Sequence, residues 1–240
     1  MDFCRTIIHV VQSGDTFYRL AQRYQTTVPD IIMRNPGVNP YNLQVGTRLR
    51  ICAGQMENPM QKDEMDLNND MRDAWANHGF WATLYLLSQN YGMSNSGAVL
   101  TRLAETGGEI SDVFGKFYSK MMTDQLKNLL NEHIELVGQL MTALREGKES
   151  ESTQIEERLR QNADRIARML SSANSEYRYE DLQRMLNLHL DMMKRQILAD
   201  LEKDYDAFVE ATDENQEHLM HLSDELTMGL IRQFYQPPQS

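Results

Sequence analysis

The sequence predicts a small α+β unit with the order strand, helix, helix, strand, followed by an all-α helical bundle that contains an internal duplication. Near the N-terminus, two short runs of β-branched and aliphatic residues bracket two stretches with helical spacing. From Asp63 to Phe234 there is no proline, and apolar side chains recur with helical periodicity among strong helix formers. The bundle should therefore hold most of the 240 residues.

The elements of the first unit follow from its turn residues. The strand-like run from Ile8 to Val11 stops at residues 13–16, where Gly permits a tight turn and Asp or Thr can cap a helix. A first helix should follow at once, and a second has Pro29 in its first turn and ends at residues 35–37. Residues 48–51 form a second strand, which can pair with the first.

This segment resembles a LysM domain along nearly its whole length. The shared features are GDT after the first strand and N-P-G, N-P and N-L-x-V-G before the second. LysM modules bind polymers of N-acetylglucosamine, such as peptidoglycan or chitin, in a shallow groove between two loops. The resemblance places Ser13, Gly14, Asp15, Thr16 and Phe17 on one wall of that groove, and Asn39, Pro40, Tyr41, Asn42, Leu43, Gln44, Val45 and Gly46 on the other.

The residue chemistry fits a neutral sugar, and it also has a purely structural explanation. Backbone groups in these loops can bond acetamido groups, and Leu43 and Val45 offer apolar contact. Equally, Asp15 can cap a helix, Gly14 and Gly46 can permit turns, and Leu43 can close a small core. Carbohydrate binding is favoured, and a LysM-like fold reused for protein contact is the alternative.

Charge and hydropathy exclude some classes of partner. A net charge of −11 disfavours nonspecific attraction to nucleic acid or to an anionic membrane surface. No run approaches the length of a membrane span, and the N-terminus has no long apolar segment after a basic start. We therefore expect a soluble protein without a Sec-type signal.

The only two cysteines, Cys4 and Cys52, bracket the first unit. If its strands pair antiparallel, the two residues lie near each other, and a disulfide would add roughly 4 kcal/mol in the chain-entropy model. Two reduced thiols are expected instead if the protein stays in a cytosol. The number and spacing of the cysteines do not suit zinc.

The chain divides into a glycan-binding domain at 1–53, a polar linker at 54–63, a helical bundle at 64–234 and a flexible tail at 235–240. Bundle helices are expected near 64–91, 95–118, 123–146, 153–173, 179–203 and 205–234. Residues 100–146 recur at 156–202, so that Leu126 aligns with Leu182 and His133 with His189. Two such hairpins make a four-helix core, completed by the first and last helices.

The bundle resembles a family of poorly characterised helical-bundle proteins from spore-forming Firmicutes. The resembling residues include the WANHGFW motif at Trp75 to Trp81, the NAD motif at Asn162 to Asp164, the SSAN motif at Ser171 to Asn174 and the GLIRQF motif at Gly229 to Phe234. One aromatic expected after SSAN is displaced, to Tyr177 or Tyr179.

A metal site in the bundle is one hypothesis. Its candidate ligands are His78, His133 and His189, with Asp204, Asp213 or Glu217. Carboxylate-bridged bundles place a Glu-x-x-His pair on each of two helices, but Leu130 and Leu186 occupy the glutamate positions here. We therefore expect buried, hydrogen-bonded histidines, no metal site and no cofactor.

The favoured function is non-catalytic: the LysM segment binds an N-acetylglucosamine polymer and anchors the bundle at the cell wall or spore envelope. The sixteen methionines are explained by adaptable core packing, or alternatively by a groove for a protein partner or for self-association. A metal-dependent or hydrolytic enzyme localised by LysM, and an intracellular, cytoplasmic scaffold, are the alternatives. The helical segment has no cysteine that could act as a nucleophile.

Overall fold

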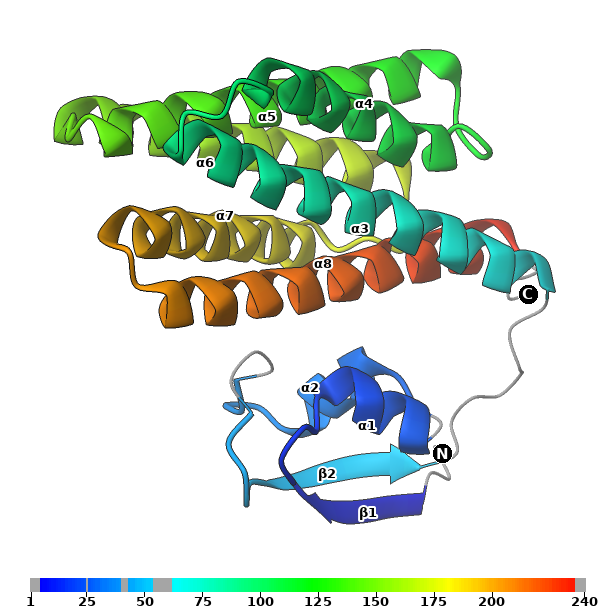
Figure 1. Ribbon diagram of the computed structural model, residues 1–240. Coiled ribbons are helices and arrows are strands. Elements are labelled where there is room, and N and C mark those ends of the chain that lie inside the picture. Colours follow the sequence, from blue (N-terminus) through cyan, green and yellow to red (C-terminus); the bar gives the residue numbers. More distant parts are fainter. Residues whose placement is uncertain (1–4, 25, 40–42, 54–61, 236–240) are drawn as a thin grey trace. The chain divides into compact units, whose positions relative to one another are not determined.

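The computed structural model describes residues 5–24, 26–39, 43–53 and 62–235. The chain forms two compact units, Met1–Lys62 and Asp63–Ser240, and each is described by itself. Figure 1 shows the short strands and helices of the first unit and the long helices of the second. No helix in the described ranges is both long and apolar enough to cross a bilayer.

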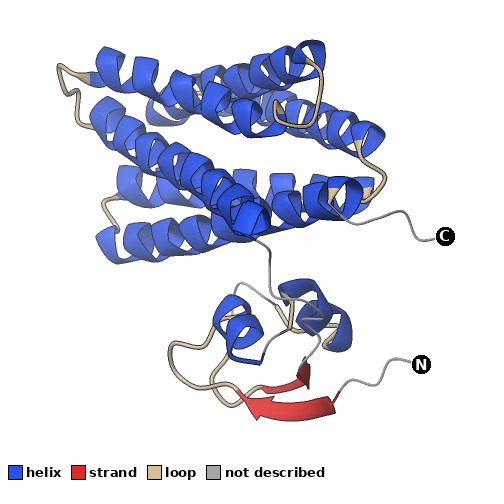
Figure 2. Ribbon diagram, turned by 90° about the vertical axis from the view of Figure 1, so that its right-hand side faces the viewer, coloured by secondary structure: helices blue, strands red, loops and turns tan. Residues whose placement is uncertain are grey.

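The first unit has the predicted order of strand, helix, helix, strand. Its elements are β1 (Arg5–Val10), α1 (Phe17–Tyr24), α2 (Val28–Arg34) and β2 (Arg48–Ala53). The strands pair antiparallel, with Arg5 opposite Ala53 and Val10 opposite Arg48. Both helices lie on one side of this two-stranded sheet (Figure 2).

Threonine hydroxyls cap the N-termini of the two helices of the first unit. The Thr16 hydroxyl accepts a hydrogen bond from the Arg19 amide at 3.1 Å, and the Thr27 hydroxyl accepts one from the Asp30 amide at 3.3 Å. Each hydroxyl satisfies an amide that has no partner within its helix. Pro29 fits the first turn of α2 because its missing N–H would be unused there.

Asn35 ties the end of α2 to the sheet. Its side-chain amide donates to the carbonyls of Ile31, at 2.7 Å, and Arg50, at 2.8 Å. Its side-chain carbonyl accepts from the Arg50 amide at 2.8 Å. One buried amide therefore satisfies both backbone groups of a β2 residue. The sequence indicated only that a helix ends at this asparagine.

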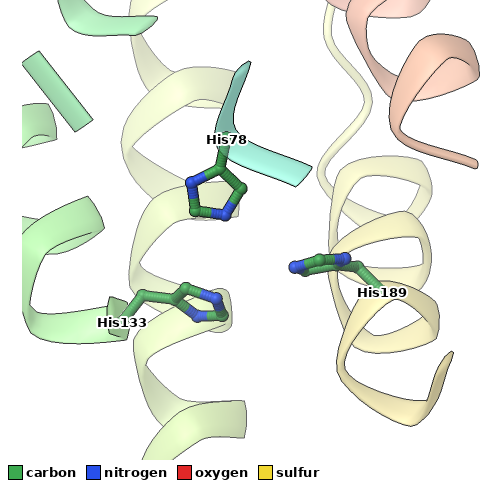
Figure 3. Close-up of side chains that lie close together, drawn as sticks. All are labelled: His78, His133 and His189. Atoms are coloured by element: carbon green, nitrogen blue, oxygen red, sulfur yellow. The ribbon is translucent and has the colours of Figure 1, made fainter. Parts of the chain in front are cut away.

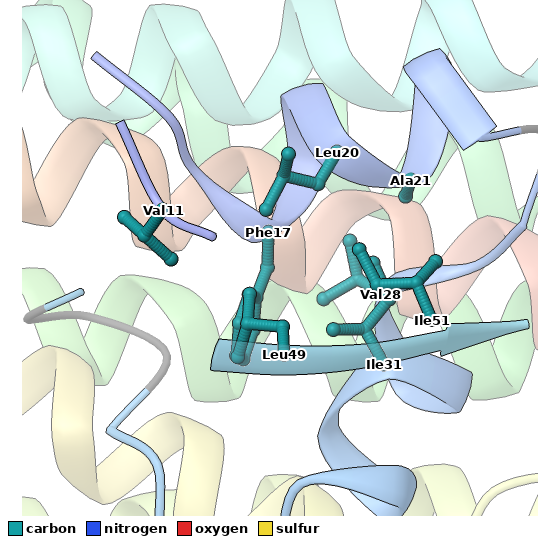
Figure 4. Close-up of a cluster of buried hydrophobic side chains, with 8 residues drawn as sticks. All are labelled: Val11, Phe17, Leu20, Ala21, Val28, Ile31, Leu49 and Ile51. Atoms are coloured by element: carbon teal, nitrogen blue, oxygen red, sulfur yellow. The ribbon is translucent and has the colours of Figure 1, made fainter. Parts of the chain in front are cut away.

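The core of the first unit is small and closed. Apolar side chains from both helices, β2 and the residue after β1 meet between the helices and the sheet (Figure 4). They are Val11, Phe17, Leu20, Ala21, Val28, Ile31, Leu49 and Ile51. Leu20, Ile31, Leu49 and Ile51 have no exposed surface, so a change of volume at these positions is expected to be costly.

The described residues of the second unit form six helices. They are α3 (Lys62–Asn90), α4 (Ser96–Phe114), α5 (Lys120–Arg145), α6 (Glu149–Ala173), α7 (Tyr179–Glu202) and α8 (Tyr205–Phe234). Consecutive helices from α4 to α8 pack as neighbours, and α5 also contacts α7. The predicted all-α bundle is confirmed.

Helix α3 joins the bundle through side chains that reach several other helices. Arg72 forms a bidentate ion pair with Asp224 of α8, at 2.6 and 2.7 Å. Near the other end, the Asn90 amide donates to Asp200 of α7 at 2.7 Å. Arg145 of α5 donates to the Gln89 carbonyl at 2.8 Å. These contacts hold α3 against both halves of the bundle.

The duplicated hairpin lies where the sequence places it. Shifting α4 by 56 residues gives 152–170, and α6 spans Glu149–Ala173. The same shift moves α5 to 176–201, and α7 spans Tyr179–Glu202. Helix α4 ends at Phe114, four residues before the expected end, because the amides of Gly115 and Phe117 turn back to Asp112 and Phe114 in short i to i+3 bonds.

Candidate functional site

The two loops predicted to bind glycan are joined through the backbone of Val11. The Val11 amide donates to the Thr47 carbonyl at 2.9 Å, and the Gly46 amide donates to the Val11 carbonyl at 2.8 Å. Gly14 and Gly46 have positive φ angles of 83° and 90°, which side chains rarely allow. The loop after β1 and the loop before β2 therefore lie side by side, with their turns fixed by glycine.

Asp15 holds the first loop in place. Its Oδ2 accepts hydrogen bonds from His9 Nε2 at 2.6 Å and from the Gln12 amide at 2.8 Å, and Arg23 lies 3.2 Å from Oδ1. Burial alone would raise the pKa of Asp15, but these hydrogen bonds and charges lower it. The carboxylate is thus a structural anchor, and its partners offset its negative charge.

His9 links that anchor to α1. A carboxylate can only accept, so His9 Nε2 carries the hydrogen that reaches Asp15. In the neutral ring, His9 Nδ1 is then the acceptor for the Tyr24 hydroxyl, 2.8 Å away. Nothing in the sequence pattern singled out His9 or Tyr24, because they are far apart in the chain and meet only in the fold.

The predicted glycan residues fall into three groups. Ser13, Gly14, Asn39, Gln44, Val45 and Gly46 are exposed. Asp15, Thr16, Phe17 and Leu43 support the loops: Thr16 caps α1, Phe17 is only 3% exposed, and Leu43 packs against the core. Pro40, Tyr41 and Asn42 lie outside the described residues. Among the described residues of the two loops, the exposed side chains are therefore uncharged, and the Arg19 guanidinium of α1 donates to the Gly14 carbonyl beside them, at 2.8 Å.

Cys52 is fully buried at the end of β2 and is not a free thiol. It lies opposite Thr6 in the strand register. Cys4, its predicted partner, is two residues before Thr6 and lies outside the described residues, so the pairing with Cys4 stays a prediction.

A second candidate site lies inside the bundle, where three histidines meet. His78 of α3, His133 of α5 and His189 of α7 each offer a ring nitrogen, and these atoms all lie within 4.8 Å of one another. Figure 3 shows the three imidazole rings turned toward a common centre from three helices. All three are buried, as predicted, and the duplication supplies the pair at equivalent positions.

Hydrogen bonds set the proton positions of two of these rings. The Thr106 hydroxyl donates to the Leu103 carbonyl at 2.6 Å, so it can only accept from His78 Nδ1, 3.0 Å away. His189 Nδ1 lies 2.9 Å from Asn215 Oδ1, which is also an acceptor. In the neutral form, Nε2 of both His78 and His189 is therefore a free lone pair.

The histidines are neutral at physiological pH. Burial, reinforced by the nearby His189, lowers the pKa of His78 to about 3. Burial and the two neighbouring rings hold the pKa of His133 well below its usual value. Burial also lowers the pKa of His189, against the effect of its bond to Asn215. Three close positive charges would repel one another, and neutral rings avoid this cost.

The three rings line a small cavity. The space open to the centre of a water-sized sphere is about 20 Å³, which is room for a water molecule or a small ion. Its other walls are mainly apolar, with Gln196 and Asn215 among the polar groups, and none of the described lining residues is an acid. Asp204, Asp213 and Glu217, the carboxylates considered as ligands from the sequence, are exposed and lie outside this cluster.

Several motif residues of the bundle have structural roles. Asn162 donates to the Leu129 carbonyl at 3.0 Å, and Asn174 donates to the Gly229 carbonyl at 3.0 Å. Of the two tyrosines after the SSAN motif, Tyr177 is the buried one and packs directly against Gly229. The buried methionines belong to the core, while Met121 is 80% exposed.

Comparison with known proteins identifies the first unit only. The model of the LysM domain family matches residues 9–51, from the histidine of the β1 network to the last core residue of β2. Searches of curated proteins and of solved structures found no match for the chain. A LysM domain at the N-terminus is thus supported by both its sequence and its fold.

Proposed function

We propose that this protein binds an N-acetylglucosamine-containing glycan, peptidoglycan or a chitin-like polymer, through its LysM domain without cleaving it. The observation that carries this proposal is the LysM match over residues 9–51, in which the two loops meet through the backbone of Val11. LysM is a binding domain, so glycan binding is the activity that the proposal assigns to this unit.

The loop chemistry supports a neutral ligand. Ser13, Gln44 and Asn39 expose polar side chains, and the side chain of Val45 is 69% exposed. Sugar rings and acetyl methyl groups bind such mixed surfaces through apolar contact and hydrogen bonds to amide groups. Asp15, the acidic residue of these loops, is paired with His9 and Arg23, so its carboxylate is not an isolated negative charge.

Val45 offers a sharp test because it is exposed and outside the core. Val45→Asp should weaken retention of the full-length protein on insoluble peptidoglycan or chitin by at least tenfold, since it replaces the apolar contact with a charge. Ile8→Asp is the matched control: Ile8 is 50% exposed, lies within β1 opposite Arg50 and belongs to neither loop, and this variant should bind as the wild type does. Pull-down at several protein concentrations gives both affinities.

Two results would count against glycan binding. Wild-type protein that remains in solution with both polymers would favour the alternative of an intracellular scaffold. Equal loss in the two variants would show that general destabilisation, and not the loop surface, controls retention. Unfolding of each variant, followed by circular dichroism, separates these cases.

We further propose that glycan attachment places the helical bundle at the cell wall or spore envelope. The resemblance predicted from the sequence motifs of the bundle favours the envelope, and the LysM domain would supply the attachment. A fluorescent fusion should follow the envelope in the wild type and become diffuse with Val45→Asp. A wild-type fusion that stays diffuse through sporulation would contradict this location.

A further inference from the structure

We propose that His78, His133 and His189 form a binding site for a late first-row divalent metal ion, with Zn²⁺ as the representative ion and a water molecule in the fourth position. The site lies inside the bundle and does not depend on the glycan-binding proposal. It replaces our expectation from the sequence that the bundle has no metal site.

The first argument is the convergence of the three donors. Their nitrogen atoms lie within 4.8 Å of one another, and the ring centroids of His133 and His189 are 5.6 Å apart. Three nitrogens at 2.0–2.1 Å from a tetrahedral Zn²⁺ would be roughly 3.3 Å apart. Small rotations of the side chains close this difference, because the cavity between the rings leaves them room.

The second argument is the state of the rings. Metal ligation requires a neutral imidazole with a free lone pair, while the other ring nitrogen donates to a nearby acceptor. Thr106 and Asn215 are such acceptors for Nδ1 of His78 and His189. Both rings therefore already have the tautomer and the orienting partner of a ligand, with Nε2 available for the metal.

The third argument is that the ring nitrogens would lack hydrogen-bond partners if the three histidines served only to pack the core. Ring nitrogens that line an enclosed cavity without a protein donor are unfavourable unless a water molecule or an ion occupies the cavity. No hydrogen bond to either ring nitrogen of His133 occurs within the part of the chain that the structure describes. A cation at the common centre would use the lone pairs of all three rings at once, and apolar packing would use none of them.

The ligand set also selects the type of metal. Imidazole nitrogen suits Zn²⁺, Co²⁺, Ni²⁺ and Cu²⁺, while Mg²⁺ and Ca²⁺ require oxygen ligands. The described cavity walls contain no carboxylate, so the bound ion keeps its positive charge. The fourth position would be left to solvent, and a water molecule bound there would be acidified by the ion.

The test uses untagged full-length protein, stripped with a chelator and dialysed against Zn²⁺ or Co²⁺. Wild-type protein should bind one ion per chain, and Co²⁺ should give the intense visible absorption of tetrahedral coordination. Mg²⁺ should not compete. His133→Gln and His189→Gln should each lower the affinity at least tenfold, while His221→Gln, a histidine of α8 outside the cluster, should bind as the wild type does.

Thr106→Val keeps the three ligands and removes the acceptor for His78. It should weaken binding about 10- to 100-fold, which is the usual effect of losing an orienting partner. A role confined to packing predicts no change in metal affinity for this nearly isosteric variant. Thr106 is thus a positioning residue, and the metal affinity of the Thr106→Val variant tests this role.

Absence of stoichiometric binding by wild-type protein would overturn the proposal, as would equal binding by wild type and the His133 and His189 variants. If the glutamine variants fail to fold, the Co²⁺ spectrum of the wild type still decides. A weak octahedral spectrum would indicate surface binding and would also overturn the proposal.

Discussion

At the scale of single residues, Gly229 of α8 is the most tightly packed of the described glycines. A Cβ atom there would lie 1.9 Å from Cε1 of Tyr177, whose hydroxyl donates to the Leu226 carbonyl. The tyrosine is held at both ends and cannot retreat without losing this bond. The motif glycine is therefore explained by close approach of a buried ring and not by backbone flexibility.

Gly229→Ala should lower the free energy of unfolding by about 3 kcal/mol, because it overpacks a rigid contact. Gly97→Ala is the matched control, since Gly97 is exposed in the first turn of α4 with no atom near its Cβ position, and alanine there should stabilise by up to about 0.5 kcal/mol. Urea unfolding measures both changes. An equal, small effect of the two substitutions would show that Tyr177 can move aside.

Glu225 makes the bundle sensitive to pH. Burial raises its pKa to about 7; Arg232 opposes this rise, and Asp224 and Asp181 add to it. The unfolded chain ionises near 4.5 and the folded chain near 7. Below 4.5 both states are protonated, so the stability cost begins there and grows as pH rises to about 7.

Glu225→Gln should remove this slope. The difference of about 2.5 pKa units corresponds to at most ~3 kcal/mol, and partial exposure of the carboxyl makes about 1–2 kcal/mol the expected gain at pH 8. At pH 4 the variant and the wild type should be equally stable. Denaturation at a series of pH values tests this, and parallel stability profiles would contradict the raised pKa.

At the scale of elements, helix positions were predictable but their polar partners were not. Periodicity and turn residues predicted the ends of α6 to α8 to within a few residues, and the repeat aligned His133 with His189. Thr106 and Asn215, which orient the ligand candidates, carry no local pattern, since their role depends on which helix faces overlap. The same holds for His9 and Tyr24 in the first unit.

A buried amide joins α5 and α6. Asn162 has no exposed surface, and its Nδ2 donates to the Leu129 carbonyl and to Glu132, at 3.0 and 3.1 Å. Asn162→Ala should cost about 1–3 kcal/mol, since it removes both bonds and leaves a buried carbonyl without this partner. Gln161→Ala, on the exposed face of the same helix, should cost under about 0.5 kcal/mol. Thermal unfolding compares the two, and equal effects would assign the loss to helix propensity.

At the scale of the whole molecule, the two proposed sites lie in different compact units with separate cores. Neither site shares a described residue with the other, and the loops that should bind glycan contain none of the metal-ligand candidates. Binding energy at one site can affect the other only if it changes a conformation on which both depend. Without such a shared conformation, the two activities should be separable by mutation.

Val45→Asp should therefore lose glycan retention while still binding one Zn²⁺ per chain. Conversely, a double His133→Gln, His189→Gln variant should lose Zn²⁺ binding and still be retained on peptidoglycan as the wild type is. Pull-down and metal analysis on the same samples measure both activities. Saturating Zn²⁺ should also leave the wild-type glycan affinity unchanged, because a ligand without differential affinity for two states shifts neither. Two results would contradict this independence: loss of both activities in either folded variant, or a glycan affinity that changes with Zn²⁺ occupancy. Either result would show that the two sites are energetically coupled and that the bundle controls glycan binding.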